Sequence, residues 1–145
     1  MPGVASLRAQ QYYAHPHNQF WRMMGDLYGA APTQDYARRL EALQQHQVAL
    51  WDVLHSCVRA GSLDTAIEDA LPNDLPGFLR RHPAIRLIAC NGTHAHAACR
   101  RHFAAVFARD FPRLIVLRLP STSPANASWS YDRKLAAWRA ALRMA

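Results

Sequence analysis

Residues 85–93 read Ile-Arg-Leu-Ile-Ala-Cys-Asn-Gly-Thr, and this stretch decides the fold. The apolar run up to Cys90 predicts a strand, which Asn91-Gly92 closes. Thr93 is a suitable N-cap for a helix that we expect to reach about Phe107. A strand that leads directly into a helix is typical of α/β folds.

Two further strands are expected on the same grounds. Residues 114–117, Leu-Ile-Val-Leu, are continuously apolar, as buried parallel strands are. Residues 48–51, Val-Ala-Leu-Trp, form a second short apolar run. Strands that alternate with helices predict a parallel sheet with helices on both faces. We therefore expect a three-layer α/β/α sandwich with a short parallel sheet, as a single domain over residues 1–145.

The remaining segments are expected to form helices and loops. The first of the expected helices begins near Asn18, its N-cap, and ends at Gly29. Four more are expected: over residues 34–47, from Ser62 to Ile67, over residues 77–81, and from Trp129 to Arg143 with Ser128 as N-cap. The expected irregular segments are a functional loop over 1–19, a loop or helical turn over 53–58, and a turn-rich link over 71–76.

The start of the chain has the character of a loop. Met1-Pro2-Gly3 resembles a turn that should follow a strand, yet no strand precedes it in the sequence. We therefore expect the sheet to lack its first strand, as it would in an N-terminally truncated chain or one with a mis-assigned start codon.

Charge points to a polyanionic partner. The formal net charge is +7 and the isoelectric point is near 10. Such a surplus favours nucleic acid, because neutralising phosphates releases counterions. The alternative is a basic surface of no specific meaning.

Cysteine usage and hydropathy indicate a soluble intracellular protein. Cys57, Cys90 and Cys99 are an odd number without CxxC spacing, so reduced thiols are expected. We find no apolar run of transmembrane length and no signal peptide. We expect a cytoplasmic monomer, associated with the bacterial nucleoid when it is bound to DNA, and no membrane partner.

Polar residues follow each of the three expected strands. They are Asp52, Asn91-Gly92 and the loop 121–126. Because ligands of parallel α/β sheets bind at the carboxyl ends of the strands, these segments are expected to form one site.

Two segments resemble the uracil-DNA glycosylase superfamily. In the first, Met1-Pro2-Gly3 is followed by residues 13–21, Tyr-Ala-His-Pro-His-Asn-Gln-Phe-Trp. It is similar to the Pro-Gly loop and Phe-Ala-His-Pro-x-Asn-x-Phe-Trp stretch of mismatch-specific uracil glycosylases. In the second, residues 119–126, Leu-Pro-Ser-Thr-Ser-Pro-Ala-Asn, look like the superfamily's minor-groove loop. The residue patterns of both segments are most similar to those of the hypoxanthine-DNA glycosylase branch, and the order of the expected elements matches over nearly the whole chain.

The resemblance implies a monofunctional DNA glycosylase of base excision repair. It would flip a deaminated base out of double-stranded DNA and cut its N-glycosidic bond, without a cofactor or metal. Hypoxanthine in deoxyinosine is the expected lesion; the alternatives are uracil, as in mismatch-specific enzymes, and a non-catalytic DNA-binding module. Met1 stands where the uracil-specific enzymes carry an Asn or related polar residue, so another group must orient the water.

Asn18 is the candidate for that role. Its amide can accept from a water and donate elsewhere, and the alternative is a plain helix cap. Tyr13 matches the family's stacking aromatic, although Tyr12 beside it leaves the choice open. His15 is expected to orient the loop or to donate to a phosphate, with a structural histidine as the alternative.

Asp52 is the candidate for base specificity. The resemblance places it where the classical uracil enzymes use an Asn to read the base. A carboxylate can accept from N1–H of hypoxanthine but cannot donate to O6 unless it is protonated, so a backbone N–H near Gly3 is expected to serve O6. The alternative is that Asp52 caps the following turn.

The loop 121–126 and the Asn91-Gly92 turn are the candidate DNA contacts. Asn91-Gly92 precedes a helix N-terminus, which suits a phosphate. The alternative for the loop is a Pro/Ser surface turn. Within this loop, Ser121 and Ser123 are expected to contact phosphates, and Thr122 is expected to contact DNA as well. Pro124 and Ala125 would enter the space left by the flipped base, and Asn126 would contact the opposite strand.

Two other chemistries are not expected. Cys90, Cys99 and the nearby histidines lack the paired spacing of a zinc site. Lys134, the chain's one lysine, occupies no motif position from which a Schiff base could form.

Overall fold

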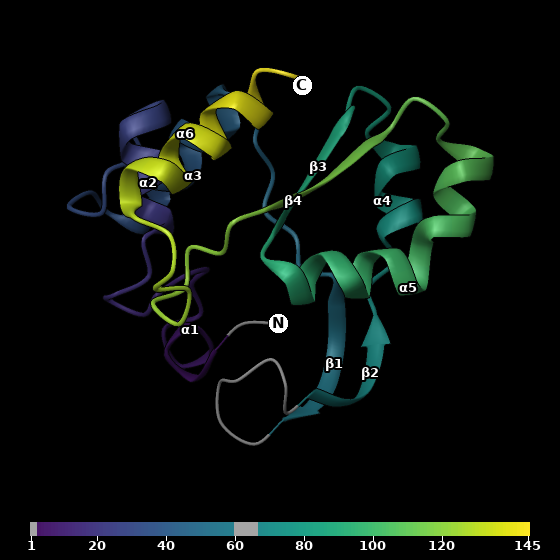
Figure 1. The fold of residues 1–145 in the computed structure, drawn as a ribbon, viewed down its shortest axis with the longest axis horizontal. Coiled ribbons are helices and arrows are strands. Elements are labelled where there is room, and N and C mark those ends of the chain that lie inside the picture. The colour runs from purple at the N-terminus through teal and green to yellow at the C-terminus, as the bar shows by residue number, and fades with distance from the viewer. Residues whose placement is uncertain (1–2, 60–66) are drawn as a thin grey trace.

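The structure is a computed structural model that describes residues 3–59 and 67–145. Figure 1 shows helices packed on both sides of a short sheet. The elements, in chain order, are α1 Val4–Ala9, α2 Phe20–Tyr28, α3 Tyr36–Gln45, β1 Leu54–Arg59, β2 Ile67–Pro72, α4 Leu75–Arg81, β3 Leu87–Asn91, α5 Thr93–Asp110, β4 Ile115–Leu119 and α6 Tyr131–Leu142.

The parallel sheet pairs β3 with β4, in register from Leu87 opposite Ile115 to Asn91 opposite Leu119. Helices α2, α3 and α6 lie on one side of it, and α4 and α5 lie on the other (Figure 1). The expected α/β class with a short parallel sheet between helical layers is therefore confirmed.

Alternation along the two strands divides the core in two. Ala89, Leu117 and Leu119 face α2 and α6, where Phe20, Trp21, Met23, Met24 and Trp138 are buried. Ile88, Cys90 and Val116 face the opposite way, onto the buried Leu75, Leu79, Cys99, Phe103 and Phe107 of α4 and α5. Because a strand turns successive side chains to opposite faces, both faces of this sheet must be covered.

The strand expected at 48–51 is absent, and that prediction was wrong. Residues 48–53 form no strand in the structure. Val48 instead donates its N–H to the carbonyl of Leu43 at 2.9 Å, and Val48 and Leu50 pack against the α2 core. Apolar side chains can be buried in this way without a ladder, so the apolar run alone did not identify a strand.

A strand forms where a loop or helical turn was expected. β1 pairs antiparallel with β2, from Leu54 opposite Pro72 to Arg59 opposite Ile67, with two irregularities in register. The prediction for 53–58 was therefore wrong, and the expected turn-rich link over 71–76 begins inside β2. The helix expected from Ser62 lies outside the described residues, apart from Ile67, which begins β2.

Several helix ends differ from expectation by one or two residues. The N-caps are Gln19 for α2, Gly92 for α5 and Ser130 for α6, in place of Asn18, Thr93 and Ser128. Helix α4 begins earlier than expected, because Asp74 caps it by accepting from the N–H of Gly77 at 2.9 Å. Helix α1 lies within the expected loop over 1–19. Within the described part of the chain, no helix has the length and apolar character that crossing a membrane requires.

Candidate active site

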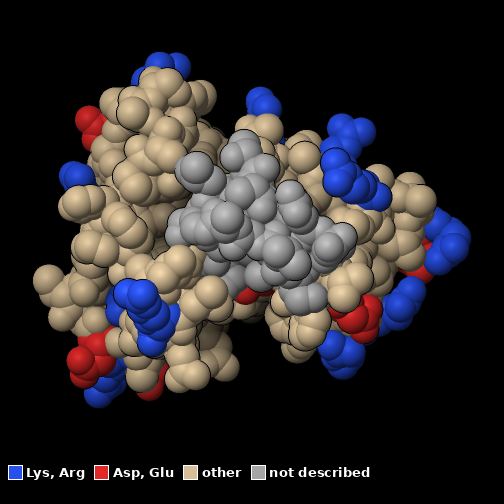
Figure 2. Space-filling view, turned by 90° about the horizontal axis from the view of Figure 1, so that it is seen from below, with Lys and Arg blue, Asp and Glu red and all other residues tan. Residues whose placement is uncertain are grey.

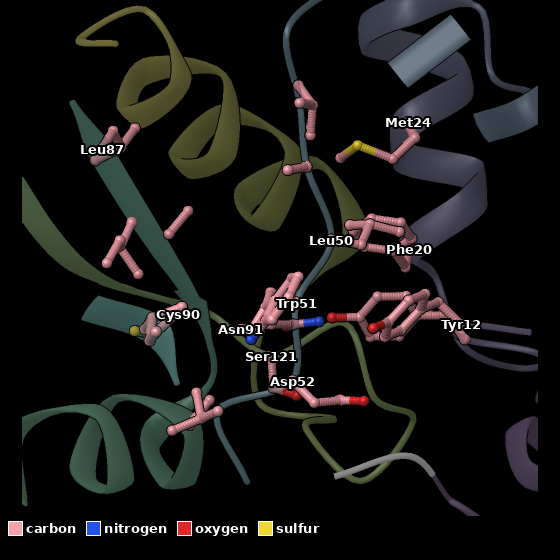
Figure 3. Close-up of a pocket in the computed structure, with 18 of the residues that line it drawn as sticks. Tyr12, Phe20, Met24, Leu50, Trp51, Asp52, Leu87, Cys90, Asn91 and Ser121 are labelled. Carbon is pink, nitrogen blue, oxygen red and sulfur yellow. The ribbon is translucent and has the colours of Figure 1, made fainter. Parts of the chain in front are cut away.

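A hollow of about 1660 Å³ lies between the segment that precedes β1 and strand β3. Figure 3 shows that Tyr12, Asp52, Asn91 and Ser121 lie together at one end of it. This end lies at the carboxyl edge of the parallel sheet, where the sequence places the site. Its other labelled lining residues are largely apolar: Phe20, Met24, Leu50, Trp51, Leu87 and Cys90.

Asn91 and Thr122 join the two strand ends. The Asn91 side chain accepts from the Thr122 N–H at 2.9 Å and donates from Nδ2 to Thr122 Oγ1 at 2.8 Å. Thr122 is 0% exposed. The structure thus brings together two segments that were both expected at the site, and it uses these two side chains to hold the loop.

Gly92 allows the two turns to approach closely. Its φ is +100°, and its N–H donates to the carbonyl of Leu119 at 3.0 Å. A Cβ placed on Gly92 would lie 3.0 Å from Cβ of Ser121. The position therefore requires glycine on two grounds, backbone conformation and space.

The loop 121–126 is shaped by its own side chains. Ser121 Oγ accepts from the N–H of Ser123 at 3.2 Å, and Ser123 Oγ accepts from the N–H of Ala125 at 3.3 Å. Asn126 Nδ2 donates back to the carbonyl of Ser121 at 3.1 Å. Pro124 and Ala125 remain exposed at the tip. The loop therefore presents a small apolar tip on a hydrogen-bonded base.

Tyr13 is fixed on both its ring and its hydroxyl. Its ring stacks on Phe20 with centroids 4.0 Å apart and an interplanar angle of 23°. Burial raises the pKa of its phenol to about 12, while a hydrogen bond with the Asn91 side chain acts in the opposite direction. One face of the Tyr13 ring is thus covered by Phe20, and its hydroxyl is tied to β3.

Tyr12 and Tyr13 both line the hollow although they are adjacent in sequence. Tyr13 has a φ of +55°, in the left-handed region that non-glycine residues rarely adopt. This conformation interrupts the alternation that would turn the two rings to opposite sides, and their centroids lie 6.4 Å apart. Strained backbone of this kind is concentrated at functional sites.

Asn18 lies half-buried at the wall of the hollow, one residue before the N-cap of α2. Its Oδ1 accepts from the N–H of Phe20 at 3.0 Å. An amide oxygen has a second lone pair, and the NH₂ of Asn18 makes no hydrogen bond within the described residues. The group can therefore support the helix start and still bind a water.

His15 lies at the rim of the hollow. It is exposed, and its Nδ1 accepts from the N–H of His17 at 3.2 Å. Gly3 lines the same hollow, close to the first turn of α1.

Asp52 is half-buried, and burial raises the pKa of its carboxyl. Its carbonyl accepts from Asn73 Nδ2 at 2.7 Å, which anchors the segment to the end of β2. In Figure 3 its side chain points into the end of the hollow that Tyr12 also lines.

Sequence reasoning missed the structural part played by Lys134 and Gln19. Lys134 is 2% exposed, and its Nζ donates to Gln19 Oε1 at 3.0 Å. The Gln19 N–H in turn donates to the carbonyl of Thr122 at 2.9 Å. The signal that could have found Lys134 is its helical spacing with Trp138 and Ala141, both of which face the core.

The cysteine and histidine pattern brings no metal site together. Cys90 and Cys99 are buried against each other, and their hydrogen bond together with burial raises the pKa of Cys90. Over 3–59 and 67–145, no group of three His, Cys, Asp or Glu side chains could hold a metal ion.

Basic side chains lie around the margin of one face of the molecule. Figure 2 views the molecule from below and shows Lys and Arg side chains around the edge of that face, with acidic side chains between some of them. This distribution suits a partner that covers the face and carries negative charge along its length.

A hollow that combines aromatic rings with polar groups at the carboxyl edge of a parallel sheet is the kind of site that accepts a flipped nucleotide in base-excision enzymes. The comparisons with known proteins agree. Over residues 1–143 the chain matches the uracil DNA glycosylase superfamily, and it belongs to that superfamily. It is a DNA glycosylase, a hydrolase of N-glycosidic bonds, and its substrate is DNA.

Two relatives and one solved structure come from Methanosarcina species. A protein of Methanosarcina acetivorans named hypoxanthine DNA glycosylase is 34% identical over 99% of this chain and 86% of its own length. One of the same name from Methanosarcina barkeri is 39% identical over 63% of this chain and 59% of its own length. The solution NMR structure of a candidate uracil DNA glycosylase from M. acetivorans matches with a TM-score of 0.78 and 34% identity, over 99% of this chain and 84% of that one.

Proposed function

We propose that this protein excises hypoxanthine from deoxyinosine in double-stranded DNA, acting as a monomer. The observation that carries the proposal is the convergence of Asp52, Asn91 and Ser121 at one end of the hollow, where the hydroxyl of Tyr13 is hydrogen-bonded to Asn91. The names of the two Methanosarcina relatives support the choice of base.

The proposed pocket holds the flipped base between an aromatic ring and a carboxylate. Tyr13 stacks on one face of the base, as its backing by Phe20 makes its ring a rigid platform. Asp52 accepts from N1–H, and the backbone near Gly3 lies at the same hollow. His15, at the rim, orients the loop or meets a phosphate.

The chemistry requires a water and a means to stabilise the departing base. As the N-glycosidic bond breaks, positive charge develops on the sugar and negative charge on the base. Asn18 positions the water, using the amide atoms that its bond to Phe20 leaves available. The water oxygen bonds to the anomeric carbon and the water gives up one proton, while the base leaves with the bonding electron pair and takes up one proton from the solvent, so that the reaction is a net hydrolysis.

DNA contacts come from the loop 121–126 and the start of α5. Ser121 and Ser123 meet phosphates, and the exposed Pro124 and Ala125 enter the space that the flipped nucleotide vacates. Asn126 faces the opposite strand. Asn91, Gly92 and Thr122 support this surface from behind, with the free N–H groups of α5 offering a phosphate seat.

The reaction stops at an abasic site. A lyase step would need an amine that reaches the sugar. Lys134 is buried, and its Nζ is bonded to Gln19, so we expect no Schiff base from it.

A lesion panel tests the proposal. Labelled duplexes with one inosine, uracil, xanthine or normal adenine are incubated with excess enzyme and then treated with alkali to cleave abasic sites. We expect the inosine duplex to be cut fastest and untreated samples to stay intact. Uracil presents the same edge as hypoxanthine, an N–H beside a carbonyl, and the solved relative is described as a candidate uracil enzyme. Faster loss of uracil would overturn the choice of base, and no cleavage of any lesion would overturn the proposed function.

A further inference from the structure

Hypoxanthine presents two groups to the pocket: its N1–H needs an acceptor, and the adjacent O6 needs a donor. An ionised Asp52 supplies only acceptors, and the donor considered for O6 so far is a backbone N–H near Gly3, which lines the same hollow. A side-chain donor beside the Asp52 carboxylate would serve O6 from the same wall as the acceptor for N1–H.

We propose that Tyr12 donates its phenol hydroxyl to the exocyclic oxygen of the flipped base, beside Asp52. This inference rests on the proposed function and adds a catalytic residue that also determines specificity. Figure 3 shows Tyr12 and Asp52 at the same end of the hollow.

The backbone of Tyr12 is held from both sides. Its N–H donates to the hydroxyl of Tyr36 at 3.1 Å, and its carbonyl accepts from Trp21 Nε1 at 2.8 Å. The Trp21 and Tyr36 rings pack edge to face, with centroids 5.8 Å apart, so the two partners fix each other. Backbone held in this way fixes the point from which the Tyr12 ring extends, which favours a preorganised donor.

The phenol has the right protonation state and position. It hydrogen-bonds to the backbone of Asp52, and burial together with the nearby Asp52 charge raises its pKa above the ordinary value of 10.0. Tyr12 therefore keeps its proton at neutral pH. Tyr13 is assigned to stacking instead, because its ring lies against Phe20 and burial raises the pKa of its phenol to about 12.

A donor at this position acts on rate as well as on recognition. The exocyclic oxygen gains negative charge as the base departs, so a hydrogen bond to it strengthens in the transition state. The proton stays on Tyr12, and no transfer is required. Adenine is rejected, because its N1 lone pair would face the carboxylate of Asp52.

Tyr12→Phe removes the hydroxyl and keeps the ring. We expect its single-turnover excision of hypoxanthine to fall about 10²-fold, with a much smaller change in affinity for the inosine duplex. Tyr131→Phe is the matched control, since it also removes a hydrogen-bonded phenol hydroxyl, one that donates to the Asp26 carboxylate, but lies outside the hollow. It should leave the rate unchanged. Tyr12→His, which can still donate, should recover part of the lost rate.

A second measurement uses free bases as inhibitors. Hypoxanthine and 6-mercaptopurine both present N1–H, but sulfur is a weaker acceptor than oxygen. We expect hypoxanthine to inhibit the wild-type enzyme at least tenfold more strongly, and Tyr12→Phe to lose that preference. Equal inhibition of the wild type by both bases, or a folded Tyr12→Phe enzyme with wild-type rate, would overturn the inference while leaving hypoxanthine excision intact. If the wild type removes uracil and not hypoxanthine, the proposed function fails, and the same Tyr12→Phe comparison on uracil, whose O4 replaces O6, decides the inference separately.

Discussion

Asn18 is placed to perform two tasks with one amide group. Its oxygen supports the start of α2 through the N–H of Phe20, and the same side chain faces the hollow. If it also orients the water, Asn18→Ala should slow single-turnover excision by about 10² to 10³ with little change in DNA affinity. Loss of the hydrogen bond to the Phe20 N–H, at the start of the helix, should also lower the free energy of unfolding by about 1 kcal/mol.

The control for this variant must separate the two effects. Ser130→Ala removes a comparable cap, because Ser130 Oγ accepts from the N–H of Arg133 at the start of α6, away from the hollow. It should cost similar stability, measured by urea unfolding, and leave the excision rate unchanged. An Asn18→Ala enzyme that loses only stability would reduce Asn18 to a helix cap.

Asp52 gives the reaction a pH dependence of known sign. The ionised carboxylate accepts from N1–H more strongly than the protonated acid does, and burial raises the pKa of this group above 3.8. Excision of hypoxanthine should therefore fall as the pH drops through that raised pKa, at a higher pH than an ordinary carboxyl would give. Single-turnover rates measured across the acid range at saturating enzyme would show this fall in rate, the acid limb of the pH–rate profile.

Asp52→Asn should flatten the acid limb and change which base is removed. An amide neither titrates in this range nor carries charge, and it can both accept and donate, so preference should broaden or shift towards uracil. Circular dichroism would confirm that the variant is folded. Unchanged preference between inosine and uracil duplexes, with the limb intact, would leave Asp52 a turn residue.

At the scale of elements, the site depends on how closely the turn after β3 approaches the loop after β4. Gly92→Ala would place a methyl group 3.0 Å from Cβ of Ser121 at a φ of +100°. We expect a loss of about 1–3 kcal/mol in unfolding free energy together with slower excision, because the loop 121–126 must move. Gly29→Ala is the matched control: its φ is +74° and a Cβ there meets nothing within 4 Å. It should lower stability alone, and equal effects of the two variants on the rate would contradict this account.

The elements that sequence predicted are those whose signal is local. β3 and β4 are continuous apolar runs, and α2, α5 and α6 are long enough to show helical spacing. The strand expected at 48–51 failed because a strand also needs a partner, and residues 48–53 pair with none. β1 was missed for the converse reason: its ladder with β2 depends on pairing across a long connection, not on its own pattern.

The candidate site was predictable as a set of segments but not as a geometry. The rule that ligands bind at the carboxyl ends of parallel strands predicted that Asn91 and the loop 121–126 lie together. It could not show that Asn91 and Thr122 bind each other across 31 residues, or that Lys134 supports Gln19 across 115. Nor could it choose between Tyr12 and Tyr13, because that choice depends on the left-handed backbone of Tyr13.

At the scale of the whole molecule, DNA affinity and the excision rate should depend differently on salt concentration. The net charge of +7 and the basic edge of the face in Figure 2 make binding ionic, so counterions are released as phosphates are neutralised. If roughly four phosphates are contacted, raising NaCl from about 50 to about 200 mM should weaken duplex binding by about 10²-fold.

Bond cleavage itself should be insensitive to salt and to chelators, because its groups, Asn18, Asp52 and Tyr12, lie within the hollow and act by hydrogen bonds at short range. Single-turnover rates at saturating enzyme should thus agree at both salt concentrations, and excess EDTA should leave them unchanged, while fluorescence anisotropy reports the weaker affinity. A saturated rate that falls in parallel with affinity would mean that surface charges act in the transition state. A rate abolished by EDTA and restored by zinc or magnesium would mean that a metal does, and either result would move the chemistry away from the three residues assigned to it.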